Sequence, residues 1–117
     1  MIFGIGTDII EIDRIEKKLN DEKFLNRVYT QRELAYIHTK GNKAQTAAGI
    51  FCAKEAVLKA LSQGITKIGS IEILTQTSGA PFVVLHGNLA GDFLIHVSIS
   101  HAKMYAVAQA VIEKNEK

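Results

Sequence analysis

The chain has 117 residues, of which 47% are hydrophobic and 22% charged, and its formal net charge is +2. This length suffices for one domain with a modest core, and the composition is that of an ordinary globular protein. So small a net charge gives no support to nucleic-acid binding. The single cysteine, Cys52, excludes an internal disulfide and fits a reducing compartment.

The sequence contains no predicted export or membrane segment. Residues 1–6 (MIFGIG) lack the basic stretch and long apolar core of a secretory signal. No apolar run approaches the roughly 18 residues that a membrane-spanning helix needs. We therefore expect a cytoplasmic protein.

The first half of the chain predicts one strand followed by helices. Residues 2–7 (IFGIGT) are apolar and interrupted by glycine, which favours a strand with a close neighbour. Thr30 and Glu33 form a capping-box pattern, TQRE, at the start of a helix. Apolar spacing predicts helices at residues 8–19, 21–29, 30–38 and, after a loop at 40–43, up to residue 61.

The second half predicts antiparallel strands. Apolar or alternating runs favour strands at residues 70–75, 81–86, 96–100 and 105–112, with a turn at QTSGAP and a tight link at 101–103. Small residues share one face of the last strand and one face of the long helix: Ala106, Ala108 and Ala110, and Ala53, Ala56 and Ala60. Such faces suit close packing. The order of elements predicts an α+β fold with the helices grouped on one face of an antiparallel sheet.

The segment FCAKEAVLKAL, residues 51–61, is the most informative part of the chain. Glu55 and Lys59 lie one turn apart on a helix that is otherwise almost wholly apolar or small. On a surface this pair would contribute only about 0.2–0.5 kcal/mol. Because so apolar a helix should be mostly buried, where charges need partners, we favour a functional site. Lys54 falls within the apolar stripe, and Cys52 is expected to be a buried small side chain rather than a nucleophile.

Asp8 directly follows the predicted first strand. Taken alone, it fits an N-cap of the next helix better than a metal ligand. Two carboxylates from distant segments, Asp8 and Glu55, could together hold magnesium and leave positions open for water and phosphate oxygens. Lys59 would then balance phosphate charge beside the metal. Zinc fits less well, because the four histidines are scattered along the sequence.

Two weaker candidates have ordinary explanations. His101, at the end of a predicted strand, belongs to a class of histidines that are more often solvated than catalytic. Arg14, Lys17 and Lys18 form a basic strip on the first helix, and such strips are usually solvated faces. The alternative for this strip is a local acidic partner.

Three segments together resemble one family: GIGTDIIEIDRI (4–15), AGIFCAKEAVLKAL (48–61) and VSISHAKMYAVAQAVIE (97–113). Over essentially its whole length the chain resembles the holo-[acyl-carrier-protein] synthases, the short bacterial family of 4′-phosphopantetheinyl transferases. The resemblance implies one such domain over residues 1–117 and a homotrimer with sites at subunit interfaces. It also implies magnesium-dependent transfer of the 4′-phosphopantetheine arm of coenzyme A to a serine of apo acyl carrier protein, in fatty acid biosynthesis, with release of 3′,5′-ADP.

The resemblance also implies roles for individual residues. Asp8 and Glu55 resemble the magnesium ligands, Lys59 resembles the lysine that contacts the phosphates, and Glu55 is the candidate base for the serine proton. The implied coenzyme A site comprises Lys59, His101, Lys43 and Ser100. The implied carrier-binding surface comprises Arg14, Lys18 and Phe51.

The chain departs from the family pattern in two places. Ile50 stands where many relatives carry an arginine, so a basic contact is either missing or supplied elsewhere. Residues 62–65 read Ser-Gln-Gly-Ile where the family commonly has Gly-Thr-Gly-Ile, which removes the backbone freedom of one glycine. Two other functions would use the same residues: metal-dependent hydrolysis of a nucleotide diphosphate, or a non-catalytic trimer that binds the carrier.

Overall fold

The computed structural model describes residues 1–61, 67–87 and 92–114. Its elements are β1 (Ile2–Glu11), α1 (Ile12–Glu16), α2 (Glu22–Val28), α3 (Gln31–His38), α4 (Lys43–Leu61), η1 (Ile68–Ser70), β2 (Ile71–Thr75), β3 (Pro81–Leu85), β4 (Phe93–His101) and β5 (Tyr105–Lys114). Strands β1, β5 and β4 pair in this order in one antiparallel sheet, and β2 and β3 form a separate hairpin. The predicted α+β fold is confirmed, although the described strands form two sheets rather than one.

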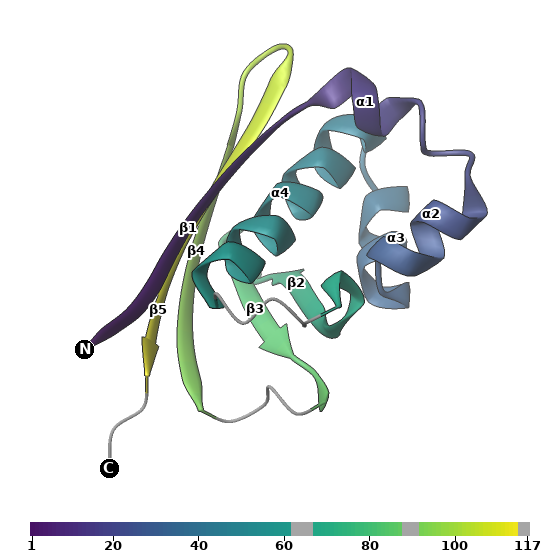
Figure 1. Cartoon of the computed structure of the whole chain (residues 1–117). Coiled ribbons are helices and arrows are strands. Elements are labelled where there is room, and N and C mark those ends of the chain that lie inside the picture. Colours follow the sequence, from purple (N-terminus) through teal and green to yellow (C-terminus); the bar gives the residue numbers. More distant parts are fainter. Residues whose placement is uncertain (62–66, 88–91, 115–117) are drawn as a thin grey trace.

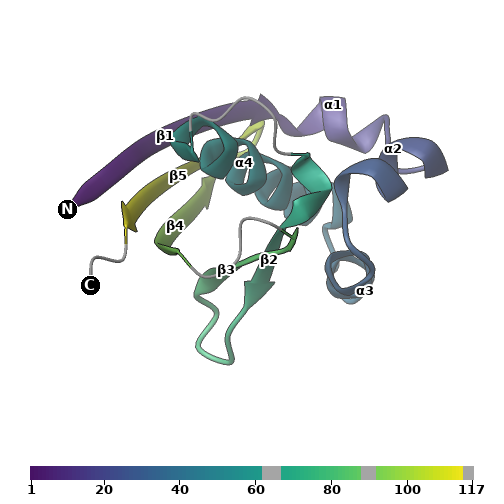
Figure 2. The same ribbon diagram turned by 60° about the horizontal axis from the view of Figure 1, so that its bottom comes forward.

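Helix α4 is the centre of the fold. It lies along one face of the three-stranded sheet, with α2 and α3 packed on its side away from the sheet and the β2–β3 hairpin beside it (Figures 1 and 2). Most of its side chains are buried, as the apolar sequence predicts. Within the described ranges, no helix is long and apolar enough to cross a membrane.

The close packing of α4 on β1 depends on glycine. A methyl group on Gly6 would overlap the carbonyl oxygen of Ala56, and one on Gly4 would overlap that of Ala60. The predicted small-residue face of the long helix is therefore confirmed as the place where another backbone approaches. Three alanines of β5 support the same packing and are at most 1% exposed: Ala106, Ala108 and Ala110.

The start of the chain differs from the prediction. Residues 8–11 continue β1 and pair with residues 105–108 of β5, so the first helix is only the five residues of α1. The alternation of exposed Ile9 with buried Ile10 is that of a strand, and it overlaps a helical spacing when read over so few residues. Because Asp8 lies inside a strand, the N-cap interpretation of this residue is wrong.

The next two helices begin where their caps predict. Asp21 accepts a hydrogen bond from the backbone N–H of Phe24 at the start of α2. Both bonds of the predicted capping box between Thr30 and Glu33 are present at the start of α3. The turn between β2 and β3 places Gly79 at a φ of +93°, which explains the glycine in QTSGAP. The altered segment at 62–65 lies outside the described residues.

Helix α3 is attached to the β2–β3 hairpin through Glu72. Its carboxylate accepts hydrogen bonds from Thr30 and Arg32 and faces the ring of His86. Burial alone would raise the pKa of Glu72, but hydrogen bonds from Arg32, Thr30 and His86 outweigh it and lower the pKa to about 2. This attachment holds α3 against β2 independently of α4.

We expect Gly6→Ala to lower the free energy of unfolding by about 1–3 kcal/mol or more, because the added methyl group must push α4 away from β1. Urea denaturation measures this loss. Gly41→Ala is the matched control, since no described atom lies within 4 Å of a methyl group built there. Equal losses in the two variants would contradict the proposed packing.

Candidate active site

The approach of α4 to β1 brings Asp8 and Lys59 together. The ammonium nitrogen of Lys59 lies 3.1 Å from Asp8 Oδ1 and donates a hydrogen bond to the carbonyl oxygen of Thr7 at 2.9 Å. Asp8 is on the same face of β1 as Gly6, and Lys59 lies one turn beyond Ala56 on α4. The glycine contact therefore determines where this ion pair forms.

Glu55 shares this environment. Burial raises the pKa of Glu55, the negative charge of Asp8 raises it further, and the positive charge of Lys59 partly opposes both. The side chain of Asp8 is only 15% exposed, whereas that of Lys59 is 54% exposed at the rim. Two partly buried carboxylates thus lie close enough to repel each other, with one ammonium group beside them. A divalent cation would relieve this repulsion.

The donor set fits magnesium. Within the residues that the structure describes, no group of three or more His, Cys, Asp and Glu side chains gathers as a metal site. Asp8 and Glu55 therefore offer two carboxylates at most. Magnesium is commonly held by one or two carboxylates, with waters and substrate phosphates completing an octahedron.

The neighbouring Cys52 is inert. Its side chain is fully buried and its sulfur lies 3.4 Å from the carbonyl oxygen of Ala106. Burial, and then the charge of Asp8, raise the pKa of the Cys52 thiol to about 12. The expectation of a buried small side chain is confirmed.

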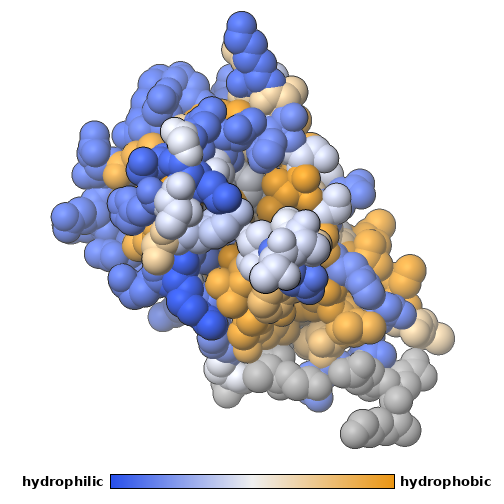
Figure 3. Space-filling model, turned by 180° about the vertical axis from the view of Figure 1, so that it is seen from behind, coloured by the Kyte–Doolittle hydropathy of each residue, from blue (hydrophilic) through white to orange (hydrophobic). Residues whose placement is uncertain are grey.

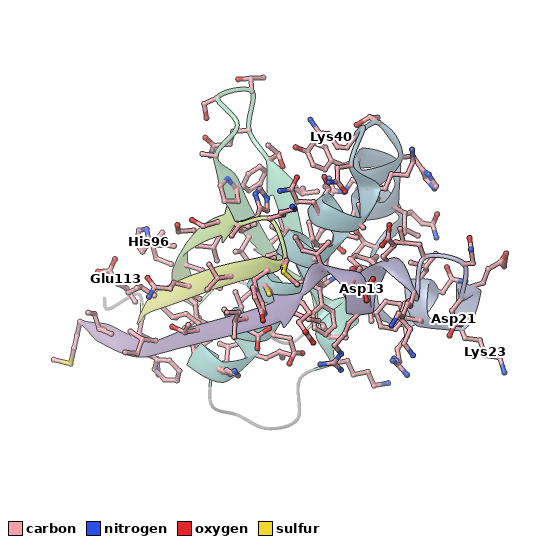
Figure 4. All side chains as sticks on the ribbon, turned by 90° about the horizontal axis from the view of Figure 1, so that it is seen from above. Asp13, Asp21, Lys23, Lys40, His96 and Glu113 are labelled. Carbon is pink, nitrogen blue, oxygen red and sulfur yellow. The ribbon has the colours of Figure 1, made fainter. Side chains whose placement is uncertain are left out.

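A pocket of about 330 Å³ lies on the other side of α4, between α3, α4, the hairpin and β4. His101, at the end of β4, and Gly49, on α4, both line it. Lys40 also lines it, with its ammonium nitrogen 4.7 Å from the centre of the Tyr36 ring (Figure 4). Ile50 and Lys40 both line this pocket, so Lys40 is a basic group close to position 50.

The other two predicted coenzyme A residues, Lys43 and Ser100, do not line this pocket. The ammonium nitrogen of Lys43 lies 3.5 Å from the carbonyl oxygen of Lys40, against the loop that precedes α4. Ser100 is exposed and, by strand alternation, points to the face of β4 opposite His101. One protomer therefore does not bring Ser100 and His101 to the same side of the sheet.

Two of the predicted carrier-binding residues, Lys18 and Phe51, lie against Phe24 of α2, which is 9% exposed. Phe51 of α4 stacks on Phe24 with ring centres 6.3 Å apart. The charged ends of Lys18 and Arg27 lie 5.7 and 5.8 Å from the centre of the Phe24 ring, and Arg14 is exposed on α1. Sequence reasoning missed the contacts of Phe24 with Phe51, Lys18 and Arg27. We call Phe24, Phe51, Lys18, Arg14 and Arg27 the aromatic–basic surface.

Sequence reasoning also missed an ion pair in the core. The side chains of Lys54 and Glu33 are both 0% exposed and 2.5 Å apart. Burial lowers the pKa of Lys54, and the carboxylate of Glu33 partly offsets this effect. The available signal was that Lys54 falls in an apolar stripe, where a charge needs a partner. Nothing in the spacing named Glu33, which is 21 residues away.

Comparison with known proteins gives consistent matches. Residues 4–111 match the model of the 4′-phosphopantetheinyl transferase superfamily. The chain is 46% identical to a holo-[acyl-carrier-protein] synthase from Fusobacterium nucleatum, over 96% of this chain and 99% of that one. It is similar to a crystal structure of a holo-(acyl-carrier-protein) synthase from Bacillus anthracis in complex with CoA (3′,5′-ADP), with a TM-score of 0.85, 39% identity and 99% of both chains covered. A Helicobacter pylori synthase in complex with coenzyme A gives a TM-score of 0.80 at 33% identity, over 93% of this chain and 99% of that one.

Magnesium should stabilise the wild-type protein but not Glu55→Gln. Without magnesium we expect Glu55→Gln to have the higher Tm, because it removes a charge that is disfavoured by burial and by Asp8. Added magnesium should raise the Tm of the wild type and so reduce the difference in Tm between Glu55→Gln and the wild type. Asp13→Asn, which removes an exposed carboxylate on α1, is the control and should respond to magnesium as the wild type does. Differential scanning fluorimetry measures the Tm of each protein with and without magnesium. Equal shifts in Tm in all three proteins would refute the site.

Proposed function

Since this chain belongs to the 4′-phosphopantetheinyl transferase superfamily, we propose that it is a magnesium-dependent holo-[acyl-carrier-protein] synthase of fatty acid biosynthesis. Its substrates are coenzyme A and apo acyl carrier protein. The observation that carries the proposal is the convergence of Asp8, Glu55 and Lys59 where α4 meets β1. The cytoplasmic location expected from the sequence stays a prediction.

The reaction is a phosphoryl transfer. The serine hydroxyl oxygen of the carrier forms a bond to the β-phosphorus of coenzyme A. The bond from that phosphorus to the bridging oxygen breaks, and 3′,5′-ADP leaves with the electron pair. The serine proton needs an acceptor, and Glu55 is the candidate base that the resemblance to the family implies.

The charge on the phosphates is balanced by two groups. Asp8 and Glu55 would hold magnesium, which when bound neutralises phosphate charge and orients the diphosphate. Lys59 lies at the rim of the same site. Its ammonium group, which pairs with Asp8, can turn outward and also contact a phosphate oxygen. Its exposure of 54% supports this role, because a long side chain at a rim can turn toward a ligand.

Coenzyme A would span two protomers. The carboxylates lie at the β1 edge of the sheet, the His101 pocket lies at the β4 edge, and α4 covers the face between them. A neighbouring protomer could present its His101 pocket to the carboxylates of this one. We assign Lys59 to the diphosphate and His101 to the nucleotide part, with Lys43 and Ser100 as further predicted contacts.

The outer face of the sheet supports assembly. Ile5, Ile9 and Leu94 project from it and are 50–70% exposed. Figure 3 shows hydrophobic residues gathered on the part of the molecule that carries the sheet. On the same face His96 and Glu113 form a pair 2.9 Å apart (Figure 4). An apolar face of this kind suits burial against other copies of the chain, which fits the predicted homotrimer.

The carrier would dock on the aromatic–basic surface. Arg14 and Lys18 supply positive charge for an acidic carrier, and half-buried Phe51 supplies an apolar contact, with Phe24, which is 9% exposed, packed against it. Charge complementarity of this kind contributes orientation and association rate more than affinity.

An intact-mass assay tests the function. We expect purified protein with magnesium, coenzyme A and apo acyl carrier protein to increase the carrier's mass by one 4′-phosphopantetheine group. A chelator should abolish the increase, and so should Glu55→Gln. Release of free 4′-phosphopantetheine without carrier would instead identify a hydrolase. Carrier binding with no mass change would identify a non-catalytic binding protein.

A further inference from the structure

Two charges in the core of the molecule have no part in the proposed chemistry. The ammonium nitrogen of Lys54 lies 2.5 Å from Glu33 Oε1 and donates to the carbonyl oxygen of Val28 at 2.5 Å. It also lies 5.7 Å from the centre of the Tyr29 ring. Both charged side chains are 0% exposed. One lysine on α4 thus contacts the end of α2 and the first turn of α3.

Every partner in this group is hydrogen-bonded. Glu33 Oε1 accepts from the backbone N–H of Thr30 at 2.8 Å, and Oε2 accepts from that of Ile73 at 2.7 Å. The hydroxyl of Tyr29 donates to the carbonyl oxygen of Ala47 at 2.7 Å. Among the described residues, no buried side-chain nitrogen or oxygen lacks a partner. A buried polar network in which every group is hydrogen-bonded typically specifies one arrangement of the helices and strands that it joins.

A gain in stability is a weak explanation for burying the ion pair of Lys54 and Glu33. Burying two charges is costly, and apolar side chains of similar volume often stabilise a core equally well or better. An apolar residue at position 54 could not donate a hydrogen bond to the carbonyl oxygen of Val28, the last residue of α2. The distinctive contribution of Lys54 is therefore the position of α2 relative to α4.

The same two helices build the aromatic–basic surface. Phe51 precedes Lys54 by one turn on α4, and Phe24 precedes Val28 by one turn on α2. The stack of half-buried Phe51 on Phe24 and the bond from Lys54 to Val28 both join α4 to α2, one turn apart along each helix. Glu55, the candidate metal ligand and base, is the next residue on α4. A shift of α2 would therefore move a docked carrier relative to Glu55.

We propose that Lys54 is a positioning residue for the carrier protein: through Val28 and Glu33 it fixes α2 on α4, so that the aromatic–basic surface presents the carrier's serine to the site at Glu55. This inference rests on the proposed function. The diphosphate part of the coenzyme A site should be insensitive to Lys54, because Asp8 and Lys59 lie at the β1 contact. The His101 pocket should change little, because the backbone N–H of Ile73, which lines it, keeps its acceptor oxygen at position 33 both in Lys54→Met and after Glu33→Gln. Helix α3 also keeps its separate attachment to β2 through Arg32 and Glu72.

The test compares three variants in steady-state transfer assays and urea denaturation. Lys54→Met removes the bond to Val28 and leaves Glu33 as an unpaired buried charge. The double variant Lys54→Met/Glu33→Gln removes the bond but also removes the unpaired charge. Arg32→Met is the control, because it breaks a different ion pair of α3 that does not reach α4. The concentration of folded enzyme is measured for each protein before its kinetic constants are compared.

We expect both Lys54 variants to raise KM for the carrier about tenfold, with KM for coenzyme A within twofold of the wild type. The double variant should regain stability relative to Lys54→Met but not regain carrier affinity. Arg32→Met should leave both KM values unchanged. If carrier KM recovers together with stability in the double variant, or if both KM values rise equally, Lys54 is merely structural and the proposal is wrong.

The double variant keeps the test decisive should Lys54→Met fail to fold. Failure of the proposed function is seen separately, since the wild-type protein would then transfer nothing to the carrier. A wild type that is active, combined with Lys54 variants whose carrier KM is unchanged, overturns this inference alone.

Discussion

The site depends on the contact between the backbones of β1 and α4. Gly4 and Gly6 leave room for the carbonyl oxygens of Ala60 and Ala56, and no larger residue fits at either glycine without moving the helix. Two residues beyond Gly6, the carboxylate of Asp8 then meets the side of α4 that carries Glu55 and Lys59. The glycine pair lies within a strand and not at a turn. It sets the distance between two segments whose charged groups must share one site.

One helix supplies charges with three different surroundings. Lys54 points into the core and is neutralised by Glu33, Glu55 is half-buried beside Asp8, and Lys59 lies at the exposed rim. Residues 54, 55 and 59 are close in sequence, yet rotation of about 100° per residue sends neighbouring side chains to different partners. Such an arrangement would let the same rigid element hold the proposed reacting groups and part of the surface on which a large substrate would dock. Rigid elements position groups better than loops do.

Much of this could be predicted from the sequence because the signals are local. The capping pattern of Thr30 and Glu33 gave the start of α3, and the apolar pattern gave α4. The first helix was predicted too early, since alternation at Ile9 and Ile10 is ambiguous until β5 is known to pair with it. Long-range pairs such as Lys54 with Glu33 leave no trace in spacing. The relation of Ser100 to His101 likewise depends on strand alternation in a strand longer than the one predicted.

The central claim is that Asp8 and Glu55 together hold the catalytic divalent cation. Manganese favours the same oxygen ligands as magnesium and is visible by anomalous diffraction. Crystals grown with manganese and coenzyme A should show a strong anomalous peak at about 2.0–2.3 Å from carboxylate oxygens of both residues. A peak bound by only one of the two carboxylates, or located elsewhere in the molecule, would contradict the account.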